Sequence, residues 1–263
     1  MSVPLRIAFD LDGVLADMES ELVRQAEILF GEAMTRRLQE RAEAQVEGAD
    51  PKTPTTTADA GTDTQADRQA TTEDSSDNVP SLLKLDMTTR QQRRLWRHIG
   101  SIESFWESLA EIEPGAVARV ATAARDRRWE VIFLTKRPDS AGATAQVQSQ
   151  RWLEANGFTL PSVYVVQGSR GRIADALGLD IVVDDRPENC LDVVVDSKAR
   201  AILVWREEEK LLPVAARRLG IGVVKSVRDC LDILTQVDSA PQDKPGVVDR
   251  VMRLLGLKEP AGV

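Results

Sequence analysis

The sequence predicts an α/β protein with a doubly wound parallel sheet and a helical cap insert. From Pro114 onward, short apolar runs alternate with segments whose apolar residues recur at helical spacing. The apolar runs are hydrophobic throughout, as expected of strands that helices cover on both faces. With 263 residues and 42% hydrophobic composition, the chain is long enough for such a core and a smaller added unit.

Each element follows from a local pattern. The first predicted strand covers residues 6–9 and ends in "DLDG". Helical patterns then cover 17–45 and 87–111, where Leu22, Ala26 and Leu95 are among the apolar positions. The remaining predicted order is helix 115–129, strand 130–135, helix 141–156, strand 162–166, helix 171–178, strand 180–185, helix 188–195, strand 200–205, strand 222–225 and helix 227–237.

These elements divide the chain into three parts. We expect a core of residues 1–16 and 112–237, a cap of residues 17–111, and a tail of residues 238–263. The cap contains an acidic stretch at about residues 46–80, which has no Leu, Ile, Phe, Met or Trp and is predicted to be a disordered loop that can be deleted without loss of folding or activity. An amphipathic helix is predicted within the tail; it would dock on the core or on a second copy in a homodimer.

Composition excludes several classes of function. His98 is the only histidine, which excludes a multi-histidine metal site. Cys190 and Cys230 form no paired motif and suit a reducing compartment, so we expect a cytoplasmic location. There is no pattern typical of a signal peptide and no apolar run long enough to span a membrane. Most of the net charge of −8 lies in the acidic stretch, and no basic stripe indicates binding of duplex nucleic acid.

Polar residues follow three of the predicted strands. Asp10 and Asp12 follow the first, Thr135 ends the second, and Asp184 and Asp185 end another. Ligands bind at the carboxyl ends of strands in such sheets, so these side chains are expected to meet. Crowded carboxylates require a cation, and oxygen ligands without histidine or cysteine favour Mg²⁺. Taken singly, each motif also has an ordinary structural explanation, such as a turn or a helix cap.

Carboxylates arranged in this way can carry out phosphoryl transfer. One can attack phosphorus and form an aspartyl-phosphate, and a second can protonate the leaving oxygen and then activate water. Gly13 allows the sharp turn after the two aspartates and brings backbone N–H groups near an anion.

The stretch "FDLDGVLAD" resembles the first motif of the haloacid dehalogenase-like (HAD) phosphatase superfamily. The resemblance implies that Asp10 is the nucleophile, that Asp12 is the general acid/base, and that Thr135 binds the transferring phosphoryl group. It also implies that Asp10, the backbone carbonyl of Asp12 and Asp184 hold Mg²⁺, with Asp185 as an accessory ligand or as a residue that orients the ligands.

The family also has a basic residue, usually lysine, shortly before the strand that carries the last aspartates. Here Arg170 and Arg172 stand in that region; Arg170 fits the spacing better, and both remain open. Within the superfamily, "SFWESLAEIEPGAVARV" resembles the 5′(3′)-deoxyribonucleotidase branch. The resemblance covers residues 5–20 and 103–205.

Four further residues are candidates for substrate binding. Lys136 and Arg137 follow Thr135 directly, where they would contact the substrate phosphate or act as solvated loop charges. Phe105 and Trp106 lie between cap and core, where they would stack on a substrate base or pack helices together.

The sequence therefore predicts a Mg²⁺-dependent phosphohydrolase for a small phosphorylated molecule, with a nucleoside monophosphate as the leading substrate. Two alternatives remain open. The first is a phosphatase of sugar phosphates or other small phosphates. The second is a non-catalytic protein of the same fold that binds a partner.

Overall fold

The computed structural model describes residues 4–48 and 85–239. The predicted parallel sheet is confirmed: six strands pair in the order β3-β2-β1-β4-β5-β6, and every neighbouring pair is parallel. The strands are β1 (Arg6–Asp10), β2 (Glu130–Thr135), β3 (Ser162–Val165), β4 (Ile181–Asp184), β5 (Arg200–Val204) and β6 (Gly222–Val224). The strand order reverses between β1 and β4, where ligands bind in sheets of this type.

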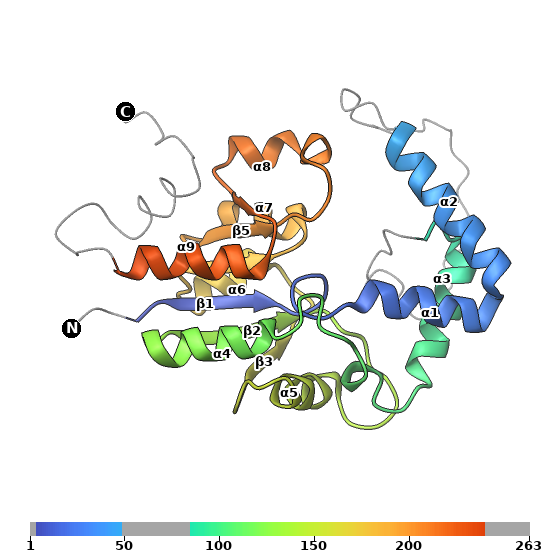
Figure 1. The fold of residues 1–263 in the computed structure, drawn as a ribbon, viewed down its shortest axis with the longest axis horizontal. Coiled ribbons are helices and arrows are strands. Elements are labelled where there is room, and N and C mark those ends of the chain that lie inside the picture. Colours follow the sequence, from blue (N-terminus) through green and yellow to red (C-terminus); the bar gives the residue numbers. More distant parts are fainter. Residues whose placement is uncertain (1–3, 49–84, 240–263) are drawn as a thin grey trace, which may run out of the picture.

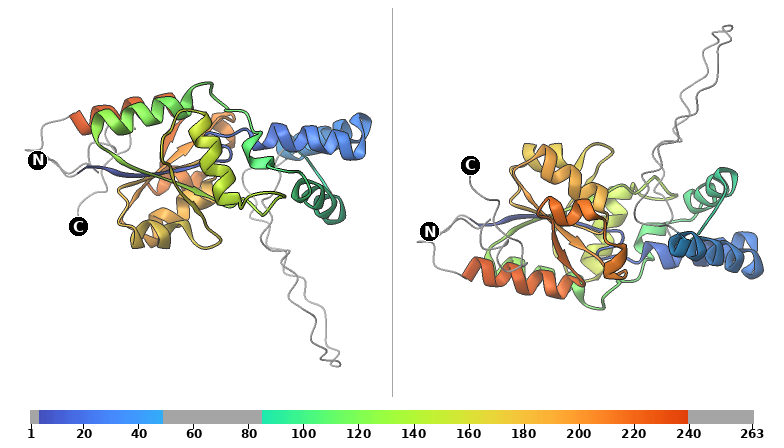
Figure 2. Two further views of the ribbon diagram at one scale, coloured as in Figure 1. Left: turned by 90° about the horizontal axis from the view of Figure 1, so that it is seen from below. Right: turned by 90° about the horizontal axis from the view of Figure 1, so that it is seen from above.

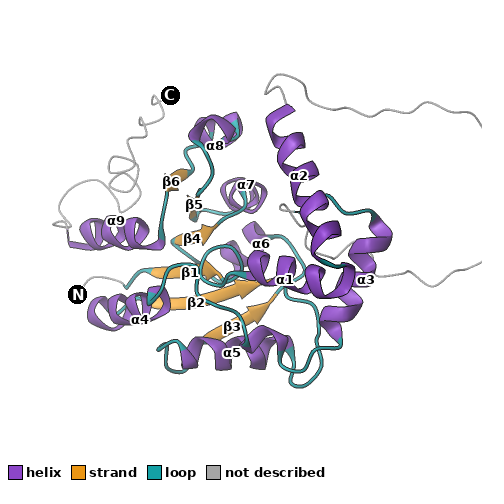
Figure 3. Ribbon diagram, turned by 45° about the vertical axis from the view of Figure 1, so that its right-hand side comes forward, coloured by secondary structure: helices purple, strands orange, loops and turns teal. Residues whose placement is uncertain are grey.

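Helices cover both faces of the sheet (Figures 2 and 3). On one face lie α4 (Ala116–Arg127), α5 (Ala145–Ala155) and α9 (Val227–Ser239); on the other lie α6 (Arg170–Ala176), α7 (Pro187–Asp196) and α8 (Val214–Arg218). Alternate residues of β1 supply both cores, since Ile7 and Phe9 join the larger apolar cluster and Ala8 joins the smaller. Burial of β1 on both faces agrees with its continuous apolar sequence.

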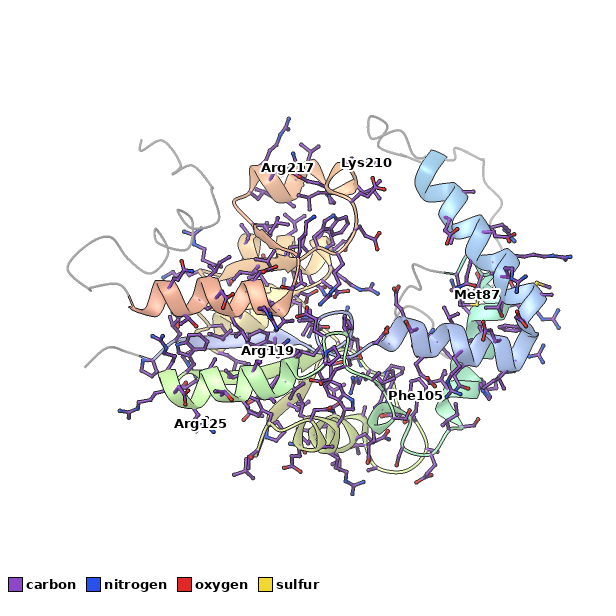
Figure 4. All side chains as sticks on the ribbon, viewed as in Figure 1. Met87, Phe105, Arg119, Arg125, Lys210 and Arg217 are labelled. Carbon is purple, nitrogen blue, oxygen red and sulfur yellow. The ribbon has the colours of Figure 1, made fainter. Side chains whose placement is uncertain are left out.

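Three helices stand apart from the sheet as the cap (Figure 1). They are α1 (Met18–Phe30), α2 (Glu32–Gly48) and α3 (Thr89–Gly100). Buried Leu22 of α1 and Leu95 and Ile99 of α3 belong to the same apolar cluster as the larger core, so cap and core are packed together. Figure 4 shows Phe105 at this junction, where a 3₁₀ turn, η2 (Phe105–Glu107), leads back toward the core.

Two expected helices are shorter than their sequence patterns. The pattern over 17–45 is divided at Gly31, whose φ of 86° ends α1 before α2 begins. The pattern over 87–111 ends at Gly100, and Ser104 then adopts a left-handed conformation with φ of 52°. Two short elements were not predicted: η3 (Glu209–Leu211) and α8.

Several sequence predictions fall partly or wholly outside the described residues. Of the acidic stretch, only residues up to Gly48 are described, as the end of α2. The predicted tail helix lies outside the described ranges. Within those ranges, no helix combines the length and apolar character needed to cross a membrane.

Candidate active site

The carboxyl ends of three adjacent strands meet at the centre of the sheet. β1 pairs with β2 on one side, with Asp10 opposite Leu134, and with β4 on the other, with Phe9 opposite Val183. This register places Thr135 and Asp184 at the strand ends that flank Asp10. The structure therefore brings together the residues that the sequence placed at three separate strand ends.

Arg170 is the basic residue that reaches these strand ends. Its Nη2 donates to Asp10 Oδ1 at 2.5 Å, and its Nε lies 3.8 Å from Asp184 Oδ2. Its side chain is only 3% exposed, and its Nε and Nη1 make no hydrogen bond. Arg172 is instead 85% exposed and lies 3.9 Å from Asp196. Of the two arginines that the sequence left open, only Arg170 contacts the aspartates at the strand ends.

Burial is the main reason why the aspartates at the site have raised pKa values. Burial, followed by repulsion from Asp184, raises the pKa of Asp10 well above its usual range. Burial also raises the pKa of Asp184, against the opposing effect of Arg170. Burial and the charge of Asp184 raise the pKa of Asp185 to about 7. One more cation at this site would offset these effects.

Asp184 is held by the start of α7. The side-chain amide of Asn189 donates to both carboxylate oxygens of Asp184 at 3.0 Å, and the backbone N–H of Arg186 donates to Oδ1 at 2.9 Å. Sequence reasoning missed Asn189. Asn189 lies in the first turn of the helix that follows the two aspartates, and that turn folds back over the strand end. This position could have identified Asn189 as a partner of Asp184.

Asp12 lies beside β2 rather than beside Arg170. Thr135 Oγ1 donates to Asp12 Oδ2 at 3.1 Å. The guanidinium of Arg137 donates to both oxygens: its Nε lies 3.1 Å from Oδ1 and 3.0 Å from Oδ2, and its Nη2 lies 2.8 Å from Oδ1. The hydroxyl of Thr135 and the charge of Arg137 are thus both directed at Asp12. Lys136, between them in sequence, is exposed.

The rings of Phe105 and Trp106 are fully buried. They pack edge to face with centroids 4.9 Å apart, and the Trp106 ring lies 4.9 Å from the Arg137 guanidinium. This placement matches the packing alternative and differs from a surface on which a base stacks. Trp152 and Ser149 also contact Arg137. Neither contact has a local signal in the sequence, because both residues lie on α5.

The turn after the two aspartates is tightly packed. Gly13 has φ of 86°, and a Cβ at this position would come within 2.0 Å of Asp185 Oδ2. Arg206, just beyond β5, donates to the carbonyls of Gly13 at 2.5 Å and Val14 at 3.1 Å, and it pairs with Glu113 at 2.9 Å. The glycine therefore allows the two acidic strand ends to approach each other.

The donor set fits Mg²⁺. Within the described ranges, no three side chains of His, Cys, Asp or Glu form a ready-made metal cage. Mg²⁺ commonly takes only one or two carboxylates and keeps several waters, so Asp10 and Asp184 are sufficient with a backbone carbonyl. Asp185 Oδ1 is buried without a hydrogen-bond partner. A cation held here would give this orphaned oxygen an electrostatic partner, directly or through a bound water.

Comparisons with known proteins give matches among solved structures alone. Neither a family model nor a curated protein matches the chain. A hydrolase from Pseudomonas syringae is 16% identical, with a TM-score of 0.46, over 90% of this chain and 100% of that chain. A putative beta-phosphoglucomutase from Thermotoga maritima is 16% identical, with a TM-score of 0.46, over 89% of this chain and 99% of that chain.

A third similar structure is a putative haloacid dehalogenase-like hydrolase from Burkholderia xenovorans LB400. It is 12% identical, with a TM-score of 0.43, over 88% of this chain and 99% of that chain.

Proposed function

We propose that this chain is a Mg²⁺-dependent phosphohydrolase of the haloacid dehalogenase-like type, which removes phosphate from a small monoester through an aspartyl-phosphate on Asp10. One observation carries the proposal: buried Arg170 contacts both Asp10 and Asp184 and keeps two nitrogens free of hydrogen bonds. Buried donors without partners are costly, and an anion such as a phosphoryl group would satisfy them.

In the first half-reaction, Asp10 attacks phosphorus. Arg170 occupies Asp10 Oδ1, which leaves Oδ2 as the attacking atom. The bond between phosphorus and the leaving oxygen breaks, and Asp12 donates a proton to that oxygen. The free donors of Arg170 balance the charge on the phosphoryl oxygens, which is the main catalytic task in phosphoryl transfer.

In the second half-reaction, water hydrolyses the aspartyl-phosphate. Asp12 accepts a proton from the water, whose oxygen bonds to phosphorus, and the electron pair of the broken bond returns to the Asp10 carboxylate. Thr135 holds the Asp12 carboxylate in both half-reactions through its hydroxyl.

Asp10, Asp184 and the backbone carbonyl of Asp12 would hold Mg²⁺, with Asp185 as an accessory ligand or as a residue that orients the others. When bound, the ion supplies positive charge for the phosphoryl oxygens and for the crowded carboxylates. A nucleoside monophosphate is the substrate that we propose, on the resemblance of residues 104–120 to the deoxyribonucleotidase branch.

Phosphate release from a panel of nucleoside monophosphates, sugar phosphates and an aryl phosphate tests the proposal. We expect turnover with Mg²⁺, none with EDTA, and none with Asp10→Asn. Asp175→Asn is the matched control, because it makes the same change at an exposed position on α6, the helix of Arg170. Turnover by Asp10→Asn would overturn the mechanism, and release from sugar phosphates alone would overturn the substrate. No turnover under any condition would favour a binding protein.

A further inference from the structure

The Arg137 guanidinium is enclosed on every side that the structure describes. Its side chain is 0% exposed. Nε and Nη2 donate to Asp12, and Nη1 donates to Ser149 Oγ at 2.9 Å. The ring of Trp106 lies 4.9 Å from the guanidinium carbon and that of Trp152 lies 5.9 Å away. A substrate phosphate has no open approach to this cation.

The residues around Arg137 are themselves fixed. Trp106 donates from Nε1 to the carbonyl of Pro138 at 2.9 Å, and Trp152 donates from Nε1 to the carbonyl of Leu109 at 2.7 Å. Ser149 is buried and donates to a backbone carbonyl of its own helix. The guanidinium is therefore held from η2 and α5, two elements that do not carry any of the aspartates.

We propose that Arg137 is a positioning residue that acts through Asp12 in the hydrolysis of the aspartyl-phosphate. This inference rests on the function proposed above. Asp12 follows β1 on a turn, where a carboxylate without partners would rotate freely about its side-chain bonds. Two guanidinium nitrogens and the Thr135 hydroxyl fix its plane instead.

The hydrogen-bond geometry leaves room for a water. A carboxylate has about four acceptor positions, and three donor groups approach Asp12. The Asp12 side chain is 11% exposed, so it is the part of this cluster that solvent reaches. The remaining acceptor position of Asp12 can take the proton of the attacking water, while the three donors hold the Asp12 carboxylate in place.

Pre-steady-state kinetics with an aryl phosphate separate this role from others. The aryl leaving group needs no proton, so formation of the aspartyl-phosphate does not depend on Asp12. For Arg137→Met we expect kcat to fall about 10- to 100-fold, the range of a misplaced general base, while kcat/KM changes less than about threefold. The first turnover should appear as a burst close to one equivalent of enzyme.

Each rival role gives another result. If Arg137 bound the substrate, kcat/KM would fall with a rise in KM. If Arg137 only supported folding, the burst would shrink with the fraction of active enzyme, and the rate per active site would stay constant. Either result would overturn the proposal. If the wild-type chain has no turnover on any substrate, the proposed function itself has failed.

Two further variants keep the test decisive if Arg137→Met does not fold. Arg137→Lys keeps the charge but cannot span both oxygens of Asp12, so kcat should still fall, by less than in Arg137→Met. Ser149→Ala removes the partner of Nη1, together with the hydrogen bond from Ser149 to a carbonyl of its own helix. It should lower kcat about threefold with unchanged kcat/KM. Wild-type kcat in both variants would overturn the proposal.

Discussion

Asp184 stands beside Asp10 at the carboxyl ends of adjacent strands, and a single guanidinium contacts both carboxylates. Both carboxyls are almost fully buried, and burial raises the pKa of each. The buried, mutually repelling carboxylates thus destabilise the folded state. Removal of a charge, protonation or a bound cation would reduce this cost. Predictions about stability follow from this relationship and from its surroundings.

The metal-free protein should lose stability as pH rises toward neutrality. The pKa of Asp185 is about 7 in the folded protein, and an unfolded aspartate has a pKa of about 3.9. Between these values the folded state binds a proton that the unfolded state lacks, so the free energy of unfolding falls as pH rises. We therefore compare the free energy of unfolding of Asp185→Asn with that of wild type at two pH values. The variant-minus-wild-type difference should be about 2–3 kcal/mol larger at pH 8 than at pH 5.

Urea unfolding in EDTA at both pH values measures this difference. Asp175→Asn, an exposed carboxyl on α6, is the control and should show no such pH-dependent gain. Equal gains for the two variants, or no gain for Asp185→Asn, would show that Asp185 does not titrate near neutrality. Mg²⁺ should raise the stability of wild type at pH 8.

Removal of the Arg170 charge should destabilise the fold. Arg170→Met leaves Asp10 and Asp184 buried without their counter-charge, for which we expect a cost of about 3–5 kcal/mol at pH 8. The cost should be smaller at pH 5, because carboxyls with raised pKa take up protons there. Arg172→Met, at an exposed position two residues away, should change stability by less than about 0.5 kcal/mol. Thermal unfolding of Arg170→Met and wild type at both pH values measures the loss of stability. An equal loss at pH 5 and pH 8 would contradict the expectation.

Two glycines with the same backbone angle should tolerate alanine differently. Gly13 and Gly31 both have φ of 86°, but a Cβ at Gly31 meets nothing within 4 Å, whereas at Gly13 it meets Asp185. Gly31→Ala should cost about 1–3 kcal/mol for the backbone alone, because φ of 86° with ψ of 150° is a conformation that essentially only glycine adopts. Gly13→Ala should cost at least about 1 kcal/mol more, since Asp185 must move. If urea unfolding gives equal stability costs for Gly13→Ala and Gly31→Ala, the Asp185 side chain moves aside without an energetic penalty.

Neither cysteine should react in the native protein. Cys190 and Cys230 are fully buried, and burial raises the pKa of both thiols. A thiol reagent that forms a mixed disulfide needs an accessible thiolate. We expect Ellman's reagent to release no colour within minutes from native protein and two equivalents in denaturant. Rapid release of one equivalent from native protein would place a thiol at the surface.

The strand ends were predictable because their signals are local. Each apolar run stops at a polar residue, and strand order brings Asp10, Thr135 and Asp184 to one edge of the sheet. The pairing of Arg137 with Asp12 was not predicted, although a signal existed. Side chains alternate along an extended segment, so Arg137 shares the side of Thr135 and Lys136 points away.

Other features had no local signal. Trp152 and Ser149 lie on a helix far from Asp12 in sequence, and only tertiary packing brings them to Arg137. The division of the first cap helix at Gly31 was missed because a single glycine inside a helical pattern is often tolerated. The backbone angle of that residue decides the outcome, and the pattern does not reveal it.

The central position of β1 has a consequence for synthesis on the ribosome. β1 is translated first, but its two neighbours, β2 and β4, begin only at Glu130 and Ile181. Until both neighbours have been made, Ile7 and Phe9 lack a complete sheet to pack into, so the nascent chain carries an apolar strand that is not fully paired. Such long-range pairing folds slowly and exposes the chain to aggregation. Slower translation, lower temperature or added chaperone should therefore raise the soluble yield.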